Sequence, residues 1–207
     1  MLRAAAPTWN APIVTLIATQ TQSPFHVLVS CILSLRTKDE TTAPASRRLF
    51  ALAETPQAML RLKAKEIEKA IYPVGFYRTK ARSILDICRV LVDCHAGQVP
   101  DDLDTLLTLK GVGRKTANLV LTQGFQKPGI CVDTHVHRIS NRWGYVRTKN
   151  PHETEMALRR KLPGQYWIEY NDLLVAFGQT ICNPTSPWCS RCPITSCCIQ
   201  RGVIRHR

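Results

Sequence analysis

Four cysteines near the C-terminal end of the sequence constrain its fold more than any other feature. They follow the pattern Cys182-x6-Cys189-x2-Cys192-x5-Cys198. Four thiolates in one short segment are the ligands that a structural zinc ion or an iron–sulfur cluster requires. Spacing alone does not choose between these two, because both accept four thiolates, and Cys197 is an alternative to Cys198. The pattern therefore predicts a loop built around a metal.

The other cysteines do not share this pattern. They lie in apolar or helical contexts and are typical of small packed hydrophobic residues: Cys31, Cys88, Cys94 and Cys131. The segment from Met1 to Pro7 is too short and broken to be a secretory signal. Cysteines in a reducing compartment rarely form disulfides, so we expect a cytoplasmic protein whose clustered cysteines bind metal.

The chain of 207 residues is strongly basic. Its 28 Lys and Arg residues against 15 Asp and Glu give a formal net charge of +13, and 44% of its residues are hydrophobic. That hydrophobic fraction is sufficient for a globular core, and the positive charge favours a polyanion such as nucleic acid. The sequence has no apolar run of about 18 residues, so a membrane is not the expected partner.

Apolar residues recur at helical spacing along most of the chain, and no segment alternates as a strand does. Ser23 and Pro24 are typical of a helix N-cap and first position, and Gly97 is typical of a helix end. We therefore expect an all-α fold. The predicted helices span residues 24–35, 42–53, 64–71, 79–95, 101–109, 115–122 and 133–143, a further helix begins at Pro151, and the last spans 167–182.

A glycine turn separates two of these helices, in the segment Leu109-Lys110-Gly111-Val112-Gly113-Arg114-Lys115. The two glycines leave the backbone without side chains, and the start of the next helix offers backbone amide groups. Such a turn can hold a DNA phosphate without reading the base sequence. The plainer alternative is that the glycines only relieve a steric conflict within the chain.

Lys115 and Asp133 are the candidate catalytic residues. Lys115 lies in the first turn of a predicted helix, where the helix dipole favours the neutral amine, and a neutral lysine amine can form a Schiff base. Asp133 precedes another helix, and its carboxylate can stabilise positive charge on a sugar or take part in proton transfer. Taken alone, each residue has a commoner role, a solvated charge for Lys115 and a helix N-cap for Asp133.

Three separated motifs together resemble the endonuclease III family of helix-hairpin-helix DNA glycosylases. They are the glycine hairpin, the segment Val132-Asp133-Thr134-His135-Val136-His137-Arg138, and the four spaced cysteines. The resemblance implies a six-helix barrel domain over residues 17–127 that contains the hairpin. It also implies an iron–sulfur cluster domain formed by residues 1–16 and 128–207.

The resemblance further implies a bifunctional DNA N-glycosylase and AP lyase of base excision repair that removes oxidised pyrimidines. Lys115 is then the nucleophile and Asp133 the catalytic carboxylate. A [4Fe-4S] cluster is expected on Cys182, Cys189, Cys192 and Cys198. The expected partner is double-stranded DNA with damaged pyrimidines or abasic sites, bound by a nucleoid-associated monomer. Residues expected at the DNA are Arg36, Phe76, Gly111, Gly113, Arg114, His135 and Arg191, with Arg201 and Arg205 as further candidates.

The chain departs from the familiar bacterial pattern of this family at three positions. Lys110 stands where proline is usual, Arg36 where glutamine is usual, and Phe76 where leucine is common. The last two positions belong to loops that fill the gap left by a flipped nucleotide in this family. Because arginine pairs well with O6 and N7 of guanine, we expect Arg36 to favour guanine opposite the lesion.

Two other functions are compatible with parts of the pattern. A mismatch glycosylase that removes thymine or uracil opposite guanine has the same fold and cluster, but monofunctional relatives of that class lack a lysine where Lys115 stands. A non-catalytic DNA-binding module would use the hairpin for the DNA backbone and the thiolates to hold the C-terminal segment. It predicts binding without nicking, and the joint presence of Lys115 and Asp133 argues against it.

Overall fold

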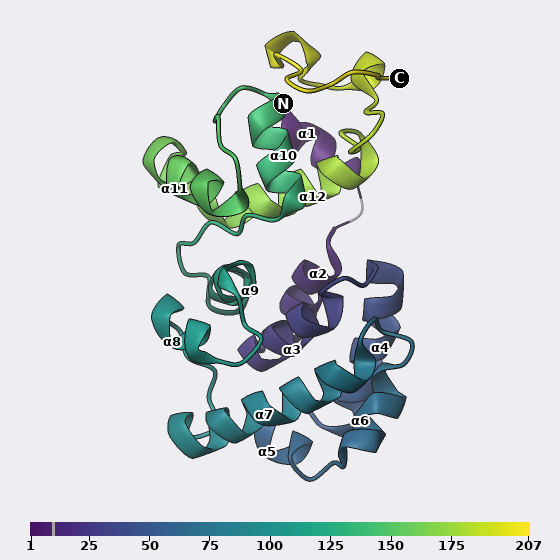
Figure 1. Cartoon of the computed structure of the whole chain (residues 1–207), viewed down its shortest axis with the longest axis vertical. Helices are drawn as coiled ribbons and strands as arrows, with labels where there is room; N and C mark the ends of the chain where they lie inside the picture. Colours follow the sequence, from purple (N-terminus) through teal and green to yellow (C-terminus); the bar gives the residue numbers. More distant parts are fainter. Residues whose placement is uncertain (10) are drawn as a thin grey trace. The chain divides into compact units, whose positions relative to one another are not determined.

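The computed structural model describes residues 1–9 and 11–207, which form helices joined by short loops (Figure 1). None of these residues belongs to a strand, and the predicted all-α class is confirmed. No helix in the described part of the chain is long and apolar enough to cross a membrane. The α-helices are α1 (Leu2–Ala5), α2 (Ile13–Thr21), α3 (Pro24–Ser34), α4 (Asp39–Leu52), α5 (Pro56–Met59), α6 (Ala64–Ile71), α7 (Tyr77–His95), α8 (Leu103–Thr108), α9 (Arg114–Leu119), α10 (Thr134–Arg142), α11 (Pro151–Lys161) and α12 (Trp167–Thr180).

The chain divides into two compact units. The hairpin unit comprises Ile13–Lys127, and the cysteine unit comprises Met1–Pro12 together with Pro128–Arg207. A boundary at residue 17, as the resemblance implies, would fall inside α2, whereas the observed division precedes that helix. The hairpin unit therefore contains α2 to α9, and the cysteine unit contains α1 and α10 to α12.

Helix α3 lies at the centre of the hairpin unit. Ser23 is its N-cap, with Oγ accepting a hydrogen bond from the backbone N of His26 at 3.3 Å, and Pro24 occupies its first position. The residues from Phe25 to Leu33 are all buried. A helix that is apolar on every side has to be enclosed by others, and α3 packs against α2, α4, α9 and the π-helical turn η2 (Val120–Gly124).

The predicted helices are present, with shifts at their ends. Helix α6 has the predicted bounds, and Glu66 closes its first turn by accepting a hydrogen bond from the Lys63 backbone N at 2.7 Å. Helix α4 begins at Asp39, earlier than predicted. Asp39 and Glu40 in its first turn interact favourably with the positive end of the helix dipole, and Pro44 is accommodated inside the helix. Helix α9 ends at Leu119, where η2 continues the chain, and α2 was not predicted.

The cysteine unit has an aromatic core. Phe177 of α12 is fully buried, and its ring centre lies 5.3 Å from that of Trp9 and 6.1 Å from that of Trp143. Trp9 comes from the N-terminal segment and Trp143 follows α10. These contacts join the first residues of the chain to its C-terminal third. Large aromatic rings bury much apolar area, so the contacts stabilise the cysteine unit.

Candidate functional site

The predicted glycine hairpin joins α8 to α9. Leu109 and Val112 are buried, and the Val112 amide donates a hydrogen bond to the Leu109 carbonyl at 3.0 Å. Gly111 has a φ of +85°, a left-handed conformation that glycine adopts without steric cost. Gly113 has an extended backbone and is the N-cap of α9.

Both glycines leave open space beside the backbone. A Cβ atom added to Gly111 or Gly113 would meet no described atom within 4 Å. Gly113 has neither a left-handed conformation nor a close neighbour, so the fold of the hairpin unit does not require glycine there. Relief of a steric conflict within the chain therefore fails to explain Gly113, although conformation explains Gly111.

Lys115 is the second residue of α9 and is exposed. It interacts electrostatically with Cys31, a residue of α3 that is 2% exposed. Burial raises the pKa of the Cys31 thiol to about 12, although Lys115 acts in the opposite direction. At neutral pH this thiol stays protonated and does not compete with Lys115 as a nucleophile.

Asp133 is the N-cap of α10, as its position before that helix predicted. Its Oδ1 accepts a hydrogen bond from the Val136 backbone N at 2.8 Å, and the residue is 9% exposed. The cap uses one carboxylate oxygen, so it is compatible with a chemical role for the other. Asp133 belongs to the cysteine unit, whereas Lys115 belongs to the hairpin unit.

His135 is half-buried between α10 and α12. Arg138 donates a hydrogen bond from Nη2 to His135 Nδ1 at 3.1 Å and another to the Cys182 carbonyl at 2.8 Å. A Cβ atom added to Gly178 of α12 would lie 2.3 Å from His135 Nδ1. His135, predicted to contact DNA, therefore also has a packing role that depends on glycine in the neighbouring helix.

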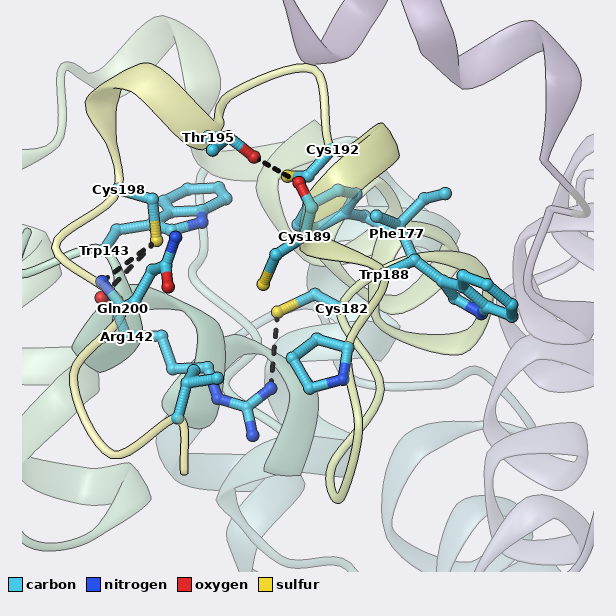
Figure 2. Close-up of a pocket in the computed structure, with 13 residues that line it drawn as sticks. Arg142, Trp143, Phe177, Cys182, Trp188, Cys189, Cys192, Thr195, Cys198 and Gln200 are labelled. Atoms are coloured by element: carbon cyan, nitrogen blue, oxygen red, sulfur yellow. Dashed lines mark hydrogen bonds between the residues drawn. The ribbon is translucent and has the colours of Figure 1, made fainter. Parts of the chain in front are cut away.

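The four predicted cysteine ligands line one pocket of the cysteine unit (Figure 2). The pocket has an empty volume of about 340 Å³, its open mouth included. Its walls are mostly apolar, formed by Trp143, Phe177, Ile181, Trp188 and Val203. Apolar walls limit the access of water to a bound metal centre.

Nitrogen donors point at two of the sulfur atoms in this pocket. Arg142 donates from Nη1 to Cys182 Sγ at 3.5 Å, and the backbone N of Gln200 donates to Cys198 Sγ at 3.4 Å (Figure 2). Burial raises the pKa of the Cys189 thiol, and the negative charge of neighbouring cysteines raises it further. A bound metal relieves this repulsion, because it neutralises the thiolates that it binds. The donor set therefore fits a metal centre held by thiolates.

Cys198 and Cys197 differ in their surroundings. Cys198 lines the pocket with the other three cysteines, whereas Cys197 is exposed and lines a different pocket beside Trp143 and Tyr166. Among the described residues, no three His, Cys, Asp or Glu side chains are grouped as ligands of a single metal ion. Four thiols around one pocket are the arrangement in which each iron of a [4Fe-4S] cluster takes one thiolate.

Arg36 and Phe76 come together from two loops of the hairpin unit. The guanidinium carbon of Arg36 lies 5.0 Å from the centre of the Phe76 ring, and Phe76 is 60% exposed. Both residues are left-handed, with φ values of 55° and 58°. Lys110, the other departure from the family pattern, pairs with Asp86 of α7 at 3.5 Å.

Sequence reasoning missed Arg207 beside the cysteine pocket. The guanidinium carbons of Arg191 and Arg207 lie 4.2 Å and 4.0 Å from the ring centre of Trp188. Arg207 also donates from its backbone N to the Pro187 carbonyl at 2.8 Å. No local pattern predicts such a contact, because its partner is a backbone carbonyl far along the chain. Arg201 and Arg205 are exposed in the same unit.

Comparison with known proteins assigns this fold and hairpin to a class. Residues 29–164 match the model of the HhH-GPD superfamily of base excision DNA repair proteins. The chain is 50% identical over 189 residues to endonuclease III of Thermotoga maritima, covering 89% of each sequence. A non-covalent endonuclease III–DNA complex matches with a TM-score of 0.86 and 34% identity, over 96% of this chain and 91% of that one.

A second solved structure is a trapped endonuclease III–DNA covalent intermediate with an estranged adenine. It matches with a TM-score of 0.81 and 37% identity, over 86% of this chain and 84% of that one. The chain belongs to the endonuclease III family.

Proposed function

We propose that this protein is a bifunctional DNA glycosylase and AP lyase of base excision repair that removes oxidised pyrimidines and works through a lysine Schiff base. The likeness to a trapped covalent endonuclease III–DNA intermediate carries the proposal, because attack by a lysine amine on the sugar would produce such a covalent intermediate. An exposed lysine directly after the open hairpin supports it. Its substrate is double-stranded DNA with a damaged pyrimidine or an abasic site.

Lys115 supplies the nucleophile. The damaged nucleotide is flipped out of the stack, since C1′ cannot be reached inside the duplex. The neutral amine attacks C1′, the bond from C1′ to the base breaks, and the base leaves with the bonding electrons and a proton. Ring opening gives an imine between Lys115 and C1′. Loss of a C2′ proton then expels the 3′ phosphate by β-elimination, and hydrolysis of the imine frees the lysine.

Asp133 acts as the carboxylate partner in this chemistry. As an ionised group it stabilises the positive charge that develops on the sugar during base loss and assists proton transfer from the lysine. Its hydrogen bond to the Val136 amide fixes Oδ1, so the carboxylate keeps one orientation while it works. An N-cap that is also catalytic gains rigidity from the helix that it begins.

The hairpin and the loops of the hairpin unit bind the DNA. Gly111, Gly113 and Arg114 hold a backbone phosphate, because open backbone amides and a nearby cation suit an anion. Arg36 and Phe76 fill the gap in the duplex, with Arg36 donating to an orphaned guanine. Arg191, Arg201 and Arg205 contact phosphates from the cysteine unit, where His135 is a further contact.

We propose that Cys182, Cys189, Cys192 and Cys198 hold a [4Fe-4S] cluster. When bound, the cluster supplies a cross-link for the loop, and neither base loss nor β-elimination requires an electron transfer. Arg142 and the Gln200 amide donate to the sulfur atoms, which stabilises them as thiolates. The enzyme works as a monomer on chromosomal DNA.

Borohydride trapping on a duplex with one thymine glycol tests the proposed function. The wild type is expected to give a covalent adduct and a nick, and both should disappear in Lys115→Gln. Lys110→Gln is the matched control, because Lys110 is an exposed lysine of the same hairpin. It should retain both products.

Other outcomes would indicate other functions. Base release without trapping would indicate a monofunctional mismatch glycosylase. Binding without either product would indicate a DNA-binding module or a different lesion.

A further inference from the structure

Two loops of the hairpin unit are joined by one buried lysine. Lys80 of α7 is 7% exposed, and its Nζ donates to the Leu33 carbonyl at 2.8 Å, the Leu35 carbonyl at 2.6 Å and Thr37 Oγ1 at 3.2 Å. An ammonium group has three N–H donors, so each donor has an acceptor. We propose that Lys80 is a positioning residue that holds Arg36 and Phe76 together and thereby sets the preference for the base opposite the lesion.

The bonds of Lys80 reach both loops. Its side chain binds the segment that carries Arg36, and it projects from the first turn of α7, where the Lys80 backbone N donates to the carbonyl of the N-cap Phe76 at 3.0 Å as in any helix. Thr37 Oγ1 accepts from Lys80 and also from the Gly75 amide at 3.2 Å. The Lys80 ammonium and the Thr37 hydroxyl thus link the start of α7 to a segment that is far away in the sequence.

The two segments are in close contact around this point. A Cβ atom added to Gly75 would lie 3.1 Å from the Arg36 carbonyl oxygen and 3.4 Å from Thr37 Oγ1. Glycine at this position therefore allows the two backbones to approach. The contact brings the Arg36 guanidinium over the Phe76 ring.

The backbone at Arg36 and Phe76 needs support to keep its conformation. Both residues have a positive φ, a backbone conformation that residues other than glycine and asparagine rarely adopt. Such conformations persist only where the surrounding structure fixes them. Without the bonds of Lys80, we expect both loops to relax and the Arg36–Phe76 contact to open.

The positive charge of Lys80 interacts favourably with the carbonyl groups that accept its hydrogen bonds. Leu33 and Leu35 lie at the C-terminal end of α3, where the helix dipole is negative and carbonyls lack partners within the helix. Burial lowers the pKa of Lys80 to about 8, so the ammonium and its three donors persist at neutral pH. An ordinary helix cap would explain these bonds without any effect on DNA, and the test has to separate the two roles.

The proposal rests on the proposed function, in which Arg36 and Phe76 fill the gap opposite the flipped nucleotide. The test uses the holoenzyme under single-turnover conditions and compares the rate of base release opposite guanine with that opposite adenine. The variants are Lys80→Met, which removes the donors, and Thr37→Val, which removes the shared hydroxyl. Lys65→Met is the matched control, because Lys65 is exposed on α6. Thr37→Ser keeps the hydroxyl.

A second readout reports whether Arg36 and Phe76 enter the gap in the duplex. Fluorescence of 2-aminopurine placed opposite an uncleavable tetrahydrofuran abasic site changes when a side chain unstacks it. Lys80→Met and Thr37→Val are expected to lose this change and at least about fivefold of the guanine-to-adenine rate ratio, since one arginine–guanine pair supplies discrimination of about that size. Lys65→Met and Thr37→Ser should keep both.

Failure of the proposal and failure of the proposed function give different results. A wild type without preference between the two bases and without a fluorescence change would overturn the gap-filling role of Arg36 and Phe76, and with it the proposal. A wild type that shows both, together with a Lys80→Met variant that is less stable but equally selective, would reduce Lys80 to a helix cap. If Lys80→Met fails to fold, the Thr37→Val and Thr37→Ser pair decides.

Discussion

At the residue scale, Gly111 and Gly113 are glycines for different reasons. Gly111 has a positive φ, so its own backbone requires glycine, whereas Gly113 has an ordinary φ and open space around it. The conformation of the chain therefore sets no requirement for glycine at position 113, which leaves room for a ligand to approach the hairpin. This separates a stability role from a binding role within a single turn.

Alanine substitutions at the two glycines should have different effects. We expect Gly111→Ala to lower the free energy of unfolding by about 1–2 kcal/mol, the cost of a left-handed alanine. Gly113→Ala should lower stability by less, about 0.5 kcal/mol, because alanine is a poorer N-cap than glycine. It should weaken DNA binding by about tenfold, because the added methyl group keeps the phosphate away from the backbone amides. Urea unfolding and fluorescence anisotropy on an abasic duplex measure the two effects. Equal DNA affinity for Gly113→Ala and the wild type would contradict the phosphate role.

Asp133 combines a structural and a chemical role, and two substitutions separate them. Asparagine caps a helix as well as aspartate does, so Asp133→Asn should keep the stability of the wild type. Its rate of base release should fall by about 10²–10⁴-fold, because the carboxylate is lost. Asp133→Ala should lose the same rate and also about 1 kcal/mol of stability. Single-turnover kinetics and urea unfolding provide both numbers, and full activity in Asp133→Asn would exclude the catalytic role.

At the element scale, the sequence predicts most helices but not the contacts that position side chains between them. Helix α6 was predicted with its observed bounds because Glu66 and the apolar spacing act within one turn or two. The start of α4 was predicted too late, because its first turn consists of the polar residues from Asp39 onward and carries no apolar spacing. Lys80 and Arg142 could not be predicted as structural residues, since their partners are backbone carbonyls of distant segments.

The contact between α10 and α12 leads to a paired substitution experiment. Gly178→Ala should lower the stability of the cysteine unit by about 1–3 kcal/mol, because its methyl group would overlap His135. Adding His135→Ala removes the ring and should recover most of that loss, although each single variant is destabilised. Urea unfolding of the four proteins measures the coupling. Additive losses would show that Gly178 acts through another neighbour.

At the scale of the whole molecule, the two units depend on different forces. The hairpin unit is held by apolar helix packing around α3, whereas the cysteine unit adds a loop in which four thiols line one mostly apolar pocket. The segments proposed to bind phosphate, carry out the chemistry and hold metal could each be picked out in the sequence, because each motif is short. The pocket and its apolar walls required the folded chain, since Trp143 and Phe177 lie outside the cysteine motif.

Loss of metal should therefore affect one unit more than the other. In Cys192→Ser we expect less bound iron and faster amide hydrogen exchange in α10 and α12, while α3 keeps the protection of the wild type. Cys197→Ser is the matched control and should retain iron. Hydrogen exchange with mass spectrometry and iron analysis test this. Equal iron in both variants would show that Cys192 is not a ligand.

The division of the chain also sets the order in which the protein is completed as it is made. Met1–Pro12 is made before the hairpin unit, yet its unit also contains Pro128–Arg207, which is made after the hairpin unit. The hairpin unit can thus fold during synthesis, whereas Trp9 can form its contact with the Phe177 ring only after α12 has been made. The hairpin unit is therefore complete before any cysteine of the pocket has been synthesised. The proposed cluster would therefore be assembled after the hairpin unit has folded, so a shortage of iron would leave that unit intact.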